Sequence, residues 1–213
     1  MKFYLKQGLF PFIYMLFMAA IAFGILAIQG LLWLKIILCV ANLALYGVVI
    51  CAAAFKDGQD AMKAQIANDL ERREIIRTGE DRPLKIHEEY KPWKGFVFGF
   101  ISCVPLIVLL AVHTIVYLAT GSYVGIGAIA GVIYLMFFVF FRLNASVAAE
   151  SATEGAAEST AVATPWYLYY GALIALPIVM TMTGVAYILG ARKIKLQQKM
   201  IKEKQRQIYG DLL

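Results

Sequence analysis

The sequence predicts an all-α integral membrane protein, a polytopic bundle of about five transmembrane helices. Of its 213 residues, 61% are hydrophobic and 16% are charged. In soluble domains about 45–50% of residues are hydrophobic and about 25% are charged. The hydrophobic residues are also gathered into runs of about 20, the length that crosses a hydrocarbon core of about 30 Å. The runs lie at residues 9–28, 31–54, 96–119, 123–141 and 166–190.

These runs favour helices over the strands of a barrel. In lipid every backbone amide must be paired within its own segment or in a closed sheet, and barrel strands alternate in polarity over about ten residues, which these runs do not. The first run is longer than the apolar core of a signal peptide, about 7–15 residues, so we expect it to be the first span. The predicted location is multi-pass in a membrane, the cytoplasmic (inner) membrane if the source is bacterial.

The first two runs are separated by only two residues and are predicted to form a tight helical hairpin. Residues 56–94 then form a polar segment with nine basic and nine acidic side chains. Charge pairs at helical spacing predict that 57–77 is an exposed helix that continues from the second run and ends at Gly79 and Pro83. We expect a solvated connector here, with a docking surface as the alternative.

The rest of the chain alternates between membrane runs and two segments of opposite charge. Residues 142–165 are predicted to be an acidic, small-residue loop that is solvated. The tail, 191–213, carries seven basic and two acidic residues and is predicted to be a basic helix. It acts as a cytoplasmic flank that fixes orientation or, alternatively, contacts anionic lipid headgroups. The whole chain, 1–213, is predicted to be a single membrane domain.

The charges of these segments conflict with five complete crossings. Basic residues collect on the cytoplasmic side, so the amino terminus, the 56–94 segment and the tail are all predicted inside. Either the fourth run does not fully cross, or the charge rule is broken at one end. The similar sequences PWKGFVFGFISCVP (92–105) and PWYLYYGALIALP (165–177) favour the second solution, because a repeated unit would send both spans in the same direction.

Polar side chains inside the predicted spans are few, and none is acidic. They fall on one face of the second span and one face of the third, so they are candidates for a polar path between these spans. The alternative is interhelical hydrogen bonding, worth about 0.6–2 kcal/mol per bond. The candidates are Lys35, Asn42, Ser102, His113 and Tyr117. In addition, Pro105 and Pro177 are predicted to kink their helices.

Signatures of catalysis are missing from the sequence. No HExxH, GxSxG or Walker motif is present, and the three cysteines are not spaced for a metal site. We therefore expect no enzyme activity, cofactor, metal site or nucleic-acid partner. The predicted role is a non-catalytic partner or accessory subunit of a membrane assembly, which contacts a membrane protein or a second copy of the chain. The alternative is a small transporter or channel.

Overall fold

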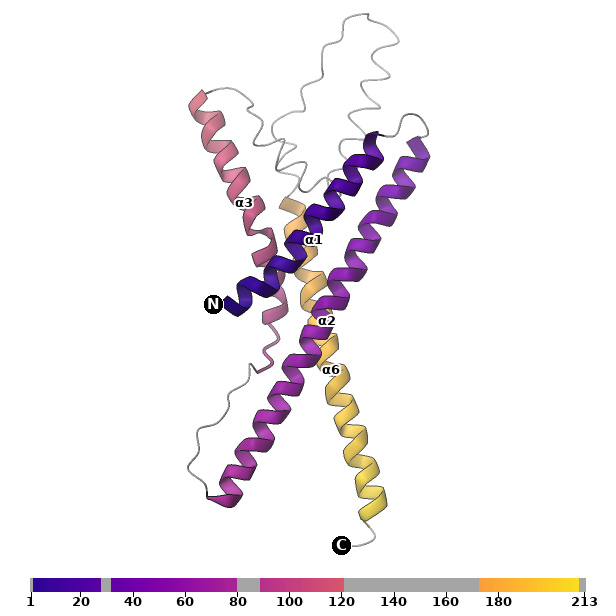
Figure 1. The fold of residues 1–213 in the computed structure, drawn as a ribbon, viewed down its shortest axis with the longest axis vertical. Helices are drawn as coiled ribbons and strands as arrows, with labels where there is room; N and C mark the ends of the chain where they lie inside the picture. Colours follow the sequence, from indigo (N-terminus) through magenta and orange to yellow (C-terminus); the bar gives the residue numbers. More distant parts are fainter. Residues whose placement is uncertain (1, 28–31, 80–88, 121–172, 211–213) are drawn as a thin grey trace, which may run out of the picture. The chain divides into compact units, whose positions relative to one another are not determined.

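The computed structural model describes residues 2–27, 32–79, 89–120 and 173–210, and this part of the chain is all-helical (Figure 1). Its helices are α1 (Lys2–Ala27), α2 (Leu32–Thr78), α3 (Lys94–Thr120) and α6 (Ala175–Tyr209). The predicted all-α class is therefore confirmed for these residues. The fourth predicted span and the acidic 142–165 loop lie outside them.

Helix α2 joins the second apolar run to the charged segment without interruption. It has 47 residues, which corresponds to about 70 Å at 1.5 Å per residue. This confirms that the exposed helix continues from the second run. The helix ends at Gly79, whose φ is +67° and whose N–H donates to the carbonyl of Ile75 at 2.9 Å. Glycine adopts this left-handed conformation without a steric penalty, so it stops the helix as predicted.

Among the described residues, α2 is the helix that is both long and apolar enough to cross a membrane. Only 28% of its most apolar window is buried. Shorter apolar helical stretches cover Leu9–Ala22, Lys94–Val104 and Leu110–Ala119. The length and composition of α2 point to membrane association, while the five-span arrangement remains a prediction.

The chain packs as two compact units, and α2, α3 and α6 each contribute to both. Unit 1 contains Met1–Val48 and Gly99–Val179, and unit 2 contains Val49–Phe98 and Met180–Leu213. In unit 1, α1 packs on α2. The Asn42 side-chain amide donates to the carbonyl of Met18 at 3.0 Å, and the rings of Tyr14 and Tyr46 stack with centroids 6.1 Å apart.

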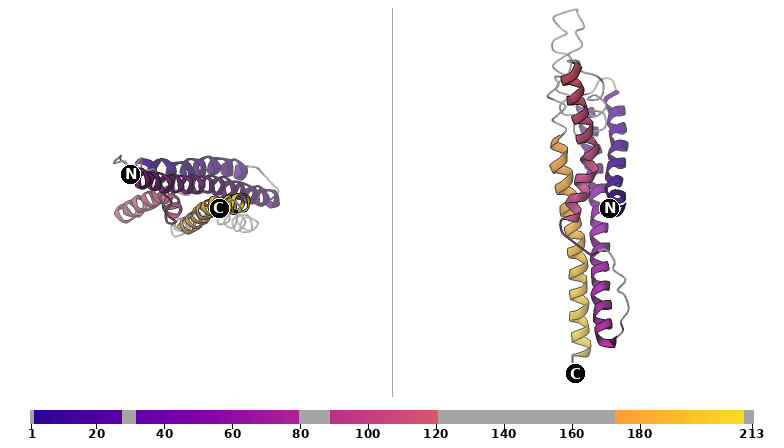
Figure 2. Two further views of the ribbon diagram at one scale, coloured as in Figure 1. Left: turned by 90° about the horizontal axis from the view of Figure 1, so that it is seen from below. Right: turned by 90° about the vertical axis from the view of Figure 1, so that its left-hand side faces the viewer.

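Unit 2 is built on a crossing of α2 and α6, joined by the first turn of α3. The two long helices cross in the same chain direction: Cys51 lies beside Met182, and residues 55–58 lie beside residues 187–190. Beyond the crossing, the charged segments of α2 and α6 extend the same way and diverge (Figure 1). The side view in Figure 2 shows the same common direction.

Two glycines bring these helices into backbone contact. A Cβ on Gly58 would overlap the carbonyl of Tyr187, and a Cβ on Gly190 would overlap the carbonyl of Phe55. The contact is reciprocal, because each helix contributes an aromatic residue and the glycine three positions later. Such close approach favours Cα–H···O contacts, worth about 0.5–1 kcal/mol each. The crossing therefore depends on the absence of a side chain at both positions.

Candidate functional site

Tyr187 is the centre of the packing in unit 2 and is almost fully buried. Its ring stacks on Tyr90 at a centroid distance of 5.5 Å and meets the ring of Phe98 edge-on at 6.0 Å. One turn earlier on α6, the Thr183 hydroxyl donates to the carbonyl of Gly95 at 2.9 Å. These contacts fix the start of α3 against α6 at the level of the helix crossing.

The residues before α3 are tied to α2 as well. The Arg72 guanidinium pairs with the Glu89 carboxylate at 2.7 Å, and the Lys94 ammonium, whose side chain is buried, donates to the Glu89 carbonyl at 2.8 Å. Trp93 is half exposed, and its carbonyl accepts the N–H of Val97 at 3.1 Å. The Pro-Trp sequence thus forms the turn directly before α3, while its second copy lies outside the described residues.

At the crossing, α2 changes from apolar to charged sequence, beginning with Lys56 and Asp57. Burial raises the pKa of Asp57 to about 6, and the neighbouring Asp60 carboxylate adds to the rise while Lys56 opposes it. Burial also raises the pKa of Tyr90, which Arg192 partly offsets. A carboxyl with a raised pKa therefore lies at the border between the apolar and charged halves of α2.

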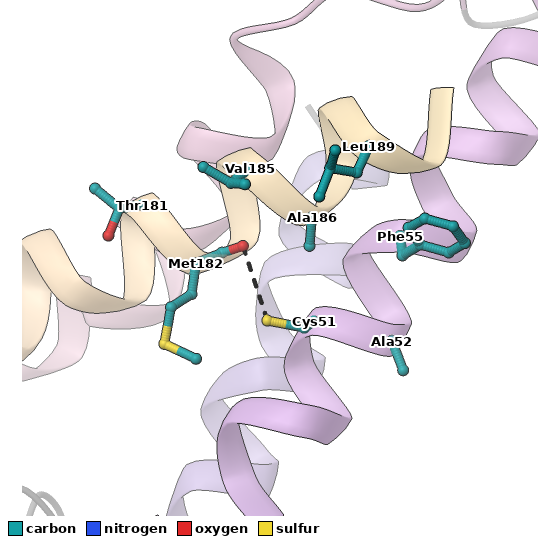
Figure 3. Close-up of a pocket in the computed structure, with 8 residues that line it drawn as sticks. All are labelled: Cys51, Ala52, Phe55, Thr181, Met182, Val185, Ala186 and Leu189. Atoms are coloured by element: carbon teal, nitrogen blue, oxygen red, sulfur yellow. Dashed lines mark hydrogen bonds between the residues drawn. The ribbon is translucent and has the colours of Figure 1, made fainter. Parts of the chain in front are cut away.

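An apolar groove of about 590 Å³ lies along one side of the same crossing (Figure 3). Helix α2 lines it with Cys51, Ala52 and Phe55. Helix α6 lines it with Thr181, Met182, Val185, Ala186 and Leu189. The Cys51 thiol donates a long hydrogen bond to the Met182 carbonyl at the base, with a sulfur–oxygen distance of 3.9 Å. Val185 and Leu189 remain about half exposed, so the groove is open along its length.

Lysines mark one end of this groove. The Lys193 ammonium lies 5.6 Å from the centroid of the Phe55 ring, within the range of a cation–π interaction. Lys193 follows Leu189 by one turn, and Lys56 follows Ala52 by one turn, so both continue faces that line the groove. Both lysines are exposed. The site therefore combines an apolar groove with two lysines near its charged end.

The predicted polar residues of the second span lie on α2. Asn42 is buried and bonds to a carbonyl of α1, as described above, which is the interhelical bonding that was the alternative to a polar path. Lys35 is partly buried on the same helix.

The predicted polar residues of the third span lie on α3. The buried Ser102 hydroxyl donates to the carbonyl of Gly99 in its own helix at 2.7 Å. Tyr117 is partly exposed, and the side chain of His113 is not among those described. The polar path between these residues and those of the second span stays a prediction.

The two predicted kink positions differ in their surroundings. Pro105 lies inside α3, which continues through it from Lys94 to Thr120. Pro177 lies in the first turn of α6, which begins at Ala175. First-turn amides have no partner within the helix, so proline removes no hydrogen bond there. Because the residues before 173 lie outside the described chain, the kink at Pro177 stays a prediction.

Sequence reasoning missed the crossing and its groove. The signal was present as Phe55-x-x-Gly58 and Tyr187-x-x-Gly190, two aromatic–glycine pairs with the same spacing at the border of apolar and charged sequence. Among the described residues no group of three or more side chains is suited to hold a metal ion. The chain matches no known protein family, no curated protein and no solved structure.

Proposed function

We propose that this chain is a multi-pass membrane protein that acts as a non-catalytic partner subunit. It presents two charged helices on one face of the membrane as its contact surface. The observation that carries this proposal is the crossing of α2 and α6 in the same chain direction, since it directs both charged segments of unit 2 the same way.

Exposed apolar side chains support the membrane placement. Large hydrophobic residues lie exposed along the apolar parts of the helices, among them Phe17 on α1, Ile37 on α2 and Leu118 on α3, the last with 78% of its surface accessible. Soluble monomers rarely expose apolar patches larger than a few hundred Å². A buried core helix would also have most of its apolar window covered, unlike α2.

The crossing supports one solution of the charge conflict. Both α2 and α6 change from apolar to charged sequence at the crossing, and α3 begins at Lys94 at the same level. The 56–94 segment and the basic tail then share one side, as the charge rule requires. A same-direction repeat of the third and fifth spans does not fit this arrangement.

The charged helices carry apolar side chains that have no cover in the described chain. Ile76 on α2 is 81% exposed, and Leu196 on α6 is 61% exposed, with Leu70, Met200 and Ile201 exposed as well. Apolar residues inside a polar rim are typical of protein interfaces. These side chains lie outside the apolar runs, where lipid tails cannot cover them. A protein partner would bury them.

The test is the size of the assembly purified in a mild detergent. We expect the wild-type chain to run in an assembly larger than a monomer, and the double variant Leu196→Gln with Ile201→Gln to lose it. Gln197→Ala with Gln205→Ala, which changes exposed polar residues of the same helix, is the matched control and should keep the assembly.

Mass determination of the intact assembly separates a second copy from a different partner. A wild-type chain recovered only as a monomer contradicts the proposal, and so does an assembly that survives the apolar substitutions unchanged.

A further inference from the structure

We propose that the groove between α2 and α6 binds an acyl chain of an anionic phospholipid, and that Lys56 and Lys193 hold its headgroup phosphate. This inference rests on the membrane placement proposed above, but it assigns a ligand to a site that the partner function does not require.

The position of the groove along the helices favours an amphiphilic ligand. Its lining residues, from Cys51 to Phe55 and from Thr181 to Leu189, come directly before the positions where both helices become charged. In a bilayer this is the border of hydrocarbon and headgroups. A volume of about 590 Å³ falls within the range of small-molecule sites, about 300–1,000 Å³. The apolar walls require an apolar occupant, and the open side faces the lipid phase.

The two lysines favour a lipid with a negatively charged headgroup. The cation–π contact with Phe55 holds the Lys193 ammonium at the wall of the groove, while Lys56 extends from the opposite helix. The neighbouring Asp57 interacts with Lys56 through its charge, but it follows Ala52 by five residues and lies about 140° around the helix from that groove residue. An anionic phosphate at this end would meet two cations from two helices.

A second copy of the chain is a poorer occupant of the groove. Two copies inserted in the same orientation would bring their lysines to the same depth, so an interface along this face would place like charges side by side. An acyl chain with an anionic headgroup fills the same apolar walls and neutralises the lysines instead. Charge therefore favours the lipid.

The experiment measures which lipid stays bound. The full chain is reconstituted in nanodiscs of equimolar phosphatidylglycerol and phosphatidylcholine, extracted in mild detergent and examined by native mass spectrometry. We expect wild type to retain phosphatidylglycerol in preference to phosphatidylcholine. Lys56→Gln with Lys193→Gln should reduce this preference by about fivefold per lysine, about 25-fold for both. Lys199→Gln with Lys202→Gln, which removes the same charge farther along α6, should leave it unchanged.

A second variant tests the groove itself. Ala52 is exposed and lines the groove, so Ala52→Phe should fill it without disturbing the buried crossing, and should lower retention of both lipids. Equal retention of the two lipids by wild type, an equal effect of both lysine pairs, or a dimer in place of bound lipid would overturn the inference. Resistance to carbonate extraction separates the two proposals: a chain released from membranes by carbonate contradicts the membrane placement, whereas a retained chain without lipid preference contradicts the lipid site alone.

Discussion

The reciprocal glycine contact makes a quantitative prediction about Gly190→Ala. A Cβ at this position would lie 2.9 Å from the carbonyl carbon of Phe55 and closer still to its oxygen. Restoring a carbon–carbon separation of about 3.5 Å moves the helices apart by about 0.6 Å at that carbon, and by more at the oxygen. The obstacle is backbone, so no change of rotamer can relieve it.

The expected loss of stability follows from three terms. Overpacking costs about 1–3 kcal/mol, and a backbone clash belongs at the upper end. Loss of Cα–H···O contacts across the crossing adds about 1 kcal/mol to the destabilisation. The higher helix propensity of alanine offsets about 1 kcal/mol of it. The net destabilisation is about 3 kcal/mol. The assay is SDS titration of the detergent-purified protein followed by circular dichroism, with Gly58→Ala as the equivalent change on α2.

The matched control is Gly24→Ala, since a Cβ there has no described atom within 4 Å. It should be neutral or stabilising by about 1 kcal/mol. If Gly58→Ala and Gly190→Ala behave like Gly24→Ala, the backbone contact between α2 and α6 does not exist, and the reasoning built on it fails.

Three further predictions follow from polar groups. Thr183→Val should cost about 0.6–2 kcal/mol in the same SDS titration because it removes a buried interhelical hydrogen bond, whereas Thr183→Ser should retain most of the stability. Asn42→Ala should cost a similar amount through loss of the bond to α1, and an unchanged midpoint would mean that this bond does not form. Because the folded state raises the pKa of Asp57 from 3.8 to about 6, the folded chain holds a proton that the unfolded chain releases, so stability should fall as pH rises from about 4 to about 6. Thermal unfolding across this range should show the slope reduced by Asp57→Asn but not by Asp69→Asn, an exposed carboxylate on the same helix; an identical slope in the Asp57 variant would contradict the assignment.

The parts of the fold that depend on local sequence could be predicted. The length of α2, its continuation past Lys56 and its end at Gly79 follow from apolar runs, charge spacing and a glycine cap, all of which act within a few residues. The helical structure of the basic tail could also be predicted from local sequence. Packing was not predictable in this way, because the contact of Gly58 with the Tyr187 carbonyl joins residues far apart in the chain.

In the candidate site, too, features that depend on local sequence could be predicted and contacts between helices could not. Asn42 was identified as polar and buried from its place in an apolar run, but its partner on α1 depends on how the helices pack. The kink at Pro177 stays a prediction, because a kink requires helix on both sides and the described part of the chain resumes only at residue 173. The groove could not be predicted because its walls come from α2 and α6, whose side-by-side position is a property of the tertiary structure alone.

The central claim is that the charged ends of α2 and α6 lie on the same side of the membrane. Sidedness reporters inserted after Gly79 and after Leu213, each in the otherwise unchanged chain, test it most directly. The account predicts that both reporters are accessible from one and the same side. Accessibility from opposite sides would contradict the same-direction crossing of α2 and α6.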